Sequence, residues 1–248
     1  MSRLPRLETS WIHSFMLHRL PPLPALQGGW NQLAFELPGR KLEIILPGDP
    51  DHLLDDPDVI AANQRDDYMP YWSYLWPAAA PFARALQSAP WPRGTDVLDL
   101  GSGIGLTGVA SLARGDRVIF TDYDPQSLLL SRHNAVRNGF DDPETLQLDW
   151  RKPIDRTFRV ITGSEVTYEK RNHEPLIELL KRMLAPSPND DFPSIAWIAD
   201  PGRYHAPAFV ELARSSGFTV TILDENLNEQ PETRSNAFQI MQLVRSAP

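Results

Sequence analysis

Strand and helix patterns alternate along the chain from residue 93 onward. Short apolar runs of strand length fall near 96–100, 117–122, 145–148, 158–163, 194–199, 218–224 and 236–244. Segments with helical periodicity lie between them, near 104–113, 125–138, 170–184 and 205–216. Such alternation predicts a doubly wound α/β fold, a parallel sheet with helices on both faces. The last two strands have no helix between them, so we expect them to pair antiparallel.

The chain before residue 93 has a different character, with dense proline and tryptophan and mixed periodicity. Leu33–Leu46 predicts a β-hairpin around a Pro-Gly turn. Pro47–Asp58 predicts a loop rich in proline and acids, and Trp76–Gln87 predicts a helix with Pro81 in its first turn. We therefore expect an N-terminal extension with a hairpin over residues 1–68 and the main domain over residues 69–248.

Composition excludes several classes of function. The 248 residues are 42% hydrophobic, enough for one sizeable core, and the net charge of −8 argues against a surface that coats nucleic acid. The absence of cysteine excludes disulfides, thiolate metal sites and a cysteine nucleophile. The sequence has no apolar run of the roughly 20 residues that span a membrane, and its N-terminus lacks a secretory cleavage pattern. We expect a soluble, cytoplasmic protein.

The loop that follows the first strand of the alternating region is rich in glycine. In VLDLGSGIG, Val97–Gly105, the glycines are Gly101, Gly103 and Gly105. A phosphate-binding P-loop is excluded because no lysine follows, and a dinucleotide fingerprint fits imperfectly because Leu106 stands at its third glycine position. Asp99 would repel a pyrophosphate but suits a ligand that brings an ammonium group. S-adenosylmethionine has such a group, a sulfonium and no phosphate.

Two further strand ends carry acids. Asp122 lies 21 residues after Gly101, where a carboxylate can accept hydrogen bonds from both hydroxyls of a ribose. This position does not separate NAD from S-adenosylmethionine, because both carry a ribose. Asp149 could accept from an adenine amino group, and Trp150 could cover the adenine face. The alternative is a tight strand-to-helix turn that binds no ligand.

The segment VLDLGSGIGLTGVA resembles motif I of class I S-adenosylmethionine-dependent methyltransferases. Three more segments, Met69–Ala80, Leu148–Trp150 and Ser164–Glu169, resemble the seven-β-strand protein lysine methyltransferases, a group that includes enzymes acting on the electron-transfer-flavoprotein β-subunit. The resemblance implies a Rossmann-like sheet of seven strands with the last one antiparallel. It also implies S-adenosylmethionine as cofactor and S-adenosylhomocysteine as product.

The resemblance also suggests where the cofactor binds. It implies contacts from Trp76, Gly101, Gly103, Asp122, Trp150 and Ser164. Together with their neighbours in the same loops, the predicted cofactor-binding residues are Trp76, Asp99, Gly101, Ser102, Gly103, Gly105, Asp122, Tyr123, Asp149, Trp150 and Ser164.

The predicted catalytic residues are Glu165 and Tyr168. The group usually has D-x-x-Y after its fourth strand, and here the acid is the longer Glu165. Methyl transfer requires alignment of nucleophile, methyl and sulfur, and exclusion of water. We expect Glu165 to receive and orient a cationic acceptor, and Tyr168 to offer its hydroxyl or ring face. Alternatively, Glu165 caps the following helix and Tyr168 packs in the core.

The sequence thus favours a methyltransferase that acts on a protein side-chain nitrogen, that of lysine. The alternatives are a small-molecule N- or O-methyltransferase, a catalytically silent module that binds S-adenosylmethionine, and a dehydrogenase. Metal binding is not expected, because the histidines show no ligand spacing and His13 and His18 are five residues apart. The sequence identifies neither the acceptor, nor the number of methyl groups, nor the oligomeric state.

Overall fold

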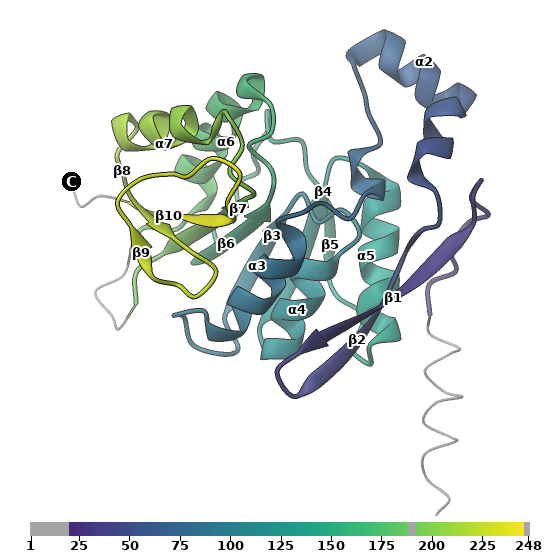
Figure 1. Ribbon diagram of the computed structural model, residues 1–248, viewed down its shortest axis with the longest axis horizontal. Coiled ribbons are helices and arrows are strands. Elements are labelled where there is room, and N and C mark those ends of the chain that lie inside the picture. Colours follow the sequence, from purple (N-terminus) through teal and green to yellow (C-terminus); the bar gives the residue numbers. More distant parts are fainter. Residues whose placement is uncertain (1–19, 188–191, 246–248) are drawn as a thin grey trace, which may run out of the picture.

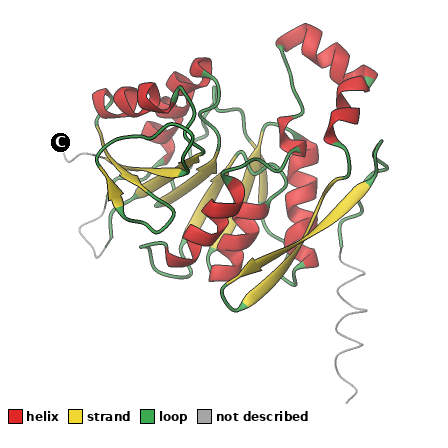
Figure 2. Ribbon diagram, in the orientation of Figure 1, coloured by secondary structure: helices red, strands yellow, loops and turns green. Residues whose placement is uncertain are grey.

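The alternating part of the chain forms one central sheet with helices on both faces (Figures 1 and 2). The computed structural model describes residues 20–187 and 192–245. The strand order is β5-β4-β3-β6-β7-β10-β8-β9. The strands are β3 (Asp96–Leu100), β4 (Arg117–Asp122), β5 (Thr145–Gln147), β6 (Val160–Ser164), β7 (Ile195–Asp200), β8 (Phe218–Leu223), β9 (Glu229–Gln230) and β10 (Gln239–Arg245).

The predicted doubly wound fold is confirmed. Strands β3 to β7 pair parallel to one another, whereas β10 lies antiparallel between β7 and β8. Each of the seven expected strands is present. The two-residue strand β9, which pairs with β8, was not expected, because a run so short leaves no periodicity in the sequence.

The helices divide between the two faces of the sheet. One buried cluster joins the sheet to α3 (Ala79–Ala85), α4 (Leu106–Arg114) and α5 (Pro125–Arg137), and another joins it to α6 (His173–Met183) and α7 (Ala206–Ser215). Short 3-10 turns, η2 (Tyr71–Ser73), η3 (Leu86–Ser88) and η4 (Lys170–Asn172), flank α3 and α6. The helix expected over Trp76–Gln87 is shorter, and Pro81 lies in the first turn of α3.

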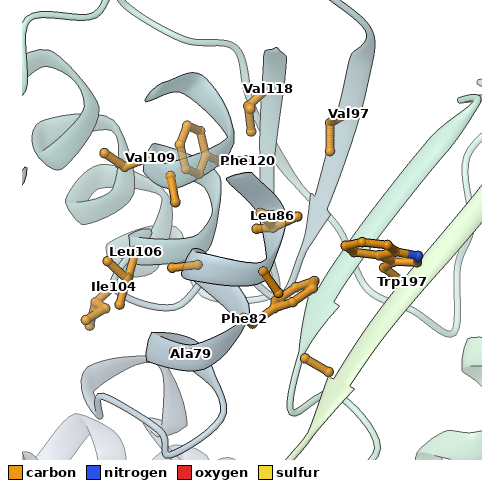
Figure 3. Close-up of a cluster of buried hydrophobic side chains, with 14 of the residues drawn as sticks. Ala79, Phe82, Leu86, Val97, Ile104, Leu106, Val109, Val118, Phe120 and Trp197 are labelled. Atoms are coloured by element: carbon orange, nitrogen blue, oxygen red, sulfur yellow. The ribbon is translucent and has the colours of Figure 1, made fainter. Parts of the chain in front are cut away.

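The sheet alternates strictly between its two cores, as a strand period of two requires. Val97 of β3 packs toward α3, whereas the next residue, Leu98, packs toward α6 and α7. Figure 3 shows the first cluster, where Phe82 of α3 lies 6.4 Å, centroid to centroid, from Trp197 of β7. Burying each such side chain contributes about 1.5–3 kcal/mol, and this packing fixes the strand ends that carry the site.

The N-terminal hairpin consists of β1 (Trp30–Leu37) and β2 (Arg40–Pro47) and lies against α5 (Figure 1). Asn134 of α5 accepts from Ile45 N–H at 2.7 Å and donates to Ile45 O at 2.8 Å. Asn138, one turn later, accepts from Glu43 N–H at 2.9 Å and donates to Glu43 O at 2.8 Å. The hairpin therefore belongs to the same core as the sheet, while the boundary at residue 69 stays a prediction.

The prediction of a loop over Pro47–Asp58 is wrong. This segment contains the 3-10 helix η1 (Pro50–Asp55) and the start of α2 (Pro57–Asp66). Asp49 and Asp56 cap the two helices through side-chain bonds to backbone N–H groups, and each is followed by a proline at the first helical position. These are helix-start signals, since proline fits the first turn and aspartate satisfies its free donors. Helix α2 buries no residue and stands away from the sheet (Figure 1).

Candidate active site

A cavity of about 540 Å³ lies where the central strands β3, β4 and β6 end. This is the edge at which open α/β sheets bind ligands. Ten of the predicted site residues line it, namely Trp76, Gly101, Gly103, Asp122, Tyr123, Asp149, Trp150, Ser164, Glu165 and Tyr168. The structure therefore brings most of the predicted set together, although their individual roles stay predictions.

Asp99, Ser102 and Gly105 are not brought into the cavity lining. The Asp99 carboxylate is only 1% exposed and lies within 3.2–3.3 Å of the hydroxyls of Thr107 and Thr162. Ser102 closes the base of the loop through its N–H bond to Thr121 O. Gly105 begins α4, where an added Cβ would lie 2.6 Å from Ser131 Cα. From the sequence alone, the residues that line the cavity could not be told apart from those, such as Ser102 and Gly105, that build the loop beneath it.

The glycine loop is tied to the acid that ends β4. Gly103 N–H donates to Asp122 Oδ2 at 3.0 Å, and the Ser127 hydroxyl lies 2.7 Å from the same oxygen. Asp122 Oδ1 accepts from Asp124 N–H at 3.0 Å. Burial raises the pKa of Asp122, while these hydrogen bonds oppose the rise. A carboxylate held in this way keeps unused acceptor capacity toward the cavity.

Trp150 and Asp149 form another part of the lining, together with Arg151. A Cβ added at Gly101 would lie 3.2 Å from the Trp150 ring, so glycine lets the indole approach the loop. Arg151 bonds both carboxylate oxygens of Asp149, at 2.8 and 2.9 Å. Burial would raise the pKa of Asp149, but the bonds and charge of Arg151 outweigh it and lower that pKa. The Asp149 carboxylate, which we expected to accept from an adenine amino group, is therefore already bound by Arg151.

Ser164 contributes an unsatisfied group. Its hydroxyl is buried at the end of β6 and has no hydrogen-bond partner within residues 20–187 and 192–245. Buried polar groups rarely stay unpaired, so a hydroxyl of this kind in a cavity wall fits a polar ligand.

Three aromatic rings form the wall near Tyr168. Its ring centroid lies 5.2 Å from that of Tyr71, and the Tyr71 ring lies 5.8 Å from Trp76, both edge-on. The Trp76 indole N–H donates to Tyr71 O at 2.8 Å, which fixes its ring. Burial raises the pKa of Tyr168, so the phenol stays neutral. Only the fold shows that Tyr71 lines the cavity.

Glu165 has a geometry that the sequence did not predict. It adopts a left-handed backbone, with φ of 56°, which is uncommon for a residue other than glycine. It does not cap the helix that follows, since Asn172 is the N-cap residue of α6. Its Oε1 instead accepts from Ala78 N–H at 2.6 Å, at the start of α3, and its Oε2 forms an ion pair with Arg203. Arg203 is a cavity residue to which the sequence analysis gave no role.

Residues of the N-terminal extension complete the mouth of the cavity. The Tyr68 hydroxyl donates to Asp124, the residue that caps α5. Asp67, at the end of α2, lies 3.2 Å from Arg171, which also bonds Glu169 at 2.6 Å. Sequence reasoning missed the contacts of Tyr68 with Asp124 and of Asp67 with Arg171, because each joins segments far apart in the chain.

Two negative findings apply to the described parts of the chain. Residues 20–187 and 192–245 contain no group of three or more histidine, aspartate or glutamate side chains placed to hold a metal ion. His13 and His18 lie outside those residues. Within the same ranges, no helix is long and apolar enough to cross a membrane.

A family model described as "Lysine methyltransferase" matches residues 73–196. The chain belongs to this lysine methyltransferase family. The resemblance noted in the sequence is therefore confirmed, and the match includes Trp76 and the strands β3, β4 and β6 that end at the cavity.

Individual relatives match this family member over shorter stretches. Calmodulin-lysine N-methyltransferase of Arabidopsis thaliana is 29% identical over 120 residues, 44% of this chain and 40% of that protein. Ribosomal protein L11 methyltransferase of Sodalis glossinidius is 37% identical over 86 residues, 34% of this chain and 29% of that protein. The matches thus span well under half of the length of either relative.

Solved structures agree on the fold. A TehB-like SAM-dependent methyltransferase from Corynebacterium glutamicum has a TM-score of 0.55 and 20% identity, and the match covers 80% of this chain and 100% of that one. At this level of identity the likeness concerns the arrangement of the sheet and helices.

Proposed function

We propose that this member of the family transfers a methyl group from S-adenosylmethionine to the side-chain nitrogen of a lysine in a protein. One observation carries the proposal. A single cavity joins Asp122 and the glycine loop to the aromatic wall of Tyr71, Trp76 and Tyr168. A cofactor-binding edge thus opens directly onto a surface suited to an amine and its methylated product.

The residues present fit the cofactor. Asp122 would accept from the ribose hydroxyls, and the Ser164 hydroxyl would gain the partner it lacks in the chain. Gly101 and Gly103 adopt φ of 66° and 54°, which glycine tolerates, and would allow the backbone to approach the amino-acid tail. When bound, S-adenosylmethionine supplies a methyl group that its sulfonium has already activated.

The remaining task of the chain is to position the acceptor. The aromatic wall can hold the lysine methylenes and exclude water, which aligns the amine and keeps competing nucleophiles out. No side chain has to act as nucleophile, so the lining needs only shape, rings and a suitable charge.

Charge supports a protein acceptor. Residues 49–67 carry seven aspartates against one arginine, a charge of 1 − 7 = −6 within a total of −8. This acidic arm, which contains η1 and α2, extends from the mouth of the cavity, where Asp66 and Asp67 line it. It fits a basic polypeptide segment around the lysine. We also place the reaction in the cytoplasm as part of this proposal.

The test uses S-adenosylmethionine labelled on its methyl group. The protein is incubated with a lysate of the source organism, and labelled proteins are hydrolysed and analysed for methylated lysine, with Asp122→Ala as the inactive control. We expect labelled methyllysine in a small set of proteins. Label in a small molecule or on oxygen would favour the small-molecule alternative. Cofactor binding without any labelled product would favour the silent module.

A further inference from the structure

Arg203 lies in the cavity beside a buried carboxylate and an indole ring. Its guanidinium forms an ion pair with Glu165, which is 4% exposed, and its Cζ atom lies 5.5 Å from the centre of the Trp76 ring. A carboxylate and an indole face are also the two groups that would hold the ammonium of a lysine. The chain therefore places its own cation where the sequence analysis expected the acceptor.

The loop that carries Arg203 is rigidly built. Asp200, at the end of β7, accepts from the N–H groups of Gly202 and Arg203, each at 2.7 Å. Gly202 has φ of 86°, and a Cβ there would lie 2.5 Å from Ala237 N. This loop therefore fixes the backbone of Arg203, and the ion pair with Glu165 holds its side chain in the cavity wall.

We infer that Arg203 is a positioning residue that keeps Glu165 occupied, so that the acceptor lysine enters as a neutral amine. The inference rests on the proposed function. A free Glu165 would bind the ammonium form and stabilise it, and an ammonium has no lone pair. The guanidinium stays charged at any working pH, so it satisfies Glu165 permanently. The acceptor proton is then lost to water, outside the ion pair.

The chemical step balances without a further reactant. The amine lone pair forms the new N–C bond as the S–C bond breaks, and the bonding electrons stay on sulfur. The products are a methylammonium and a neutral thioether. Neither Glu165 nor Arg203 gains or loses a proton, so both act by controlling which form of the acceptor binds.

The experiment measures binding of one probe, N-acetyl-Nε-[13C]methyl-lysine methylamide, to the protein saturated with S-adenosylhomocysteine. NMR titrations run at several pH values between about 7 and 10, and the shift of the labelled methyl group reports the protonation of the bound amine. We expect wild-type affinity to rise with pH, nearly tenfold per unit, because the neutral form binds.

Two variants separate the roles of the ion-pair partners. Arg203→Met frees Glu165, so the probe should bind at least tenfold more tightly at pH 7, as the ammonium, with little pH dependence. Glu165→Gln keeps Arg203, so affinity should still rise with pH as in wild type. Thermal melting and S-adenosylhomocysteine affinity show whether each variant is folded. If Arg203→Met does not fold, the result for Glu165→Gln decides alone. If Glu165 received the ammonium directly, the Glu165→Gln variant would lose probe binding at pH 7.

Besides Glu165 and Arg203, the ionisable residues that line the cavity are Asp66, Asp67, Tyr68, Tyr71, Asp122, Tyr123, Asp124, Asp149, Arg151, Tyr168, Glu169 and Arg171. They are unchanged in all variants, so their effects cancel in the comparison. A pH-independent affinity in wild type, or an Arg203→Met profile equal to wild type, would overturn the inference and leave lysine methylation standing. No probe binding by wild type, together with no labelled methyllysine in lysate, would overturn both.

Discussion

Asp99 should make the folded protein less stable as the pH rises. The side chain is 1% exposed, and burial raises its pKa to about 6 from 3.8, although hydrogen bonds from nearby hydroxyls oppose the rise. Because the folded state holds this proton more tightly than the unfolded state, the protonated acid stabilises the fold below pH 3.8, and that stability is lost as the pH rises through 6. The difference between the two pKa values corresponds to about 3 kcal/mol.

Asp99→Asn keeps the size and cannot ionise, so it should remove this penalty. Relative to wild type, the free energy of unfolding of the variant should increase by about 2 kcal/mol more at pH 8 than at pH 4.5. Urea denaturation followed by tryptophan fluorescence at both pH values measures this difference. Asp96→Asn, an exposed position on the same strand, is the matched control and should show no such gain. An equal effect of Asp99→Asn at both pH values would refute the reasoning.

Four further outcomes are expected. Gly105→Ala should cost about 2 kcal/mol or more in urea denaturation, because its Cβ would lie 2.6 Å from Ser131 Cα, whereas Gly39→Ala, with φ of 75° and open space around it, should cost about 1 kcal/mol. Asp122→Ala should weaken S-adenosylhomocysteine binding by about 1.5–3 kcal/mol in calorimetry. An unchanged affinity would contradict the assignment of Asp122 to the ribose. Calorimetry should detect S-adenosylmethionine but not NAD, and tighter NAD binding would contradict the cofactor assignment. The double variant D55N/D58N should weaken binding of a lysine-rich peptide about two- to tenfold at low salt and leave S-adenosylhomocysteine affinity unchanged; equal peptide affinity would exclude the acidic arm as its docking surface.

The sheet was predictable because its signals are local. An apolar run followed by glycine or aspartate marks the end of a strand, and strands such as Asp96–Leu100 and Arg117–Asp122 lie where expected. The same logic placed Gly101 and Asp122 at one edge, because parallel strands end on the same side. The prediction for the acidic segment before residue 67 was wrong for an equally local reason. Two Asp-Pro pairs were interpreted as part of a loop, but each marks the start of a helix.

Partners across the fold were not predictable from the sequence. The ion pair between Glu165 and Arg203 joins the loops after β6 and β7, and the bond between Tyr68 and Asp124 joins the extension to α5. No spacing rule relates such residues. The sequence also did not show which residues face the cavity: Asp99 and Gly101 are two residues apart, yet only Gly101 lines it. The sequence was therefore enough to predict where the cavity lies. The pairing of its charged residues, such as Glu165 with Arg203, could be seen only in the structure.

The hairpin has an outer edge that a neighbouring molecule could otherwise extend. On β2, the N–H and C=O groups of Glu43 and Ile45 point away from β1, and such free groups invite pairing with a strand of another chain. Asn138 and Asn134 bind both groups of these two residues. Two amide side chains, one helical turn apart, thus substitute for a third strand. The consequence is protection against aggregation: this edge is closed by the protein's own helix, and no partner strand is needed to satisfy it.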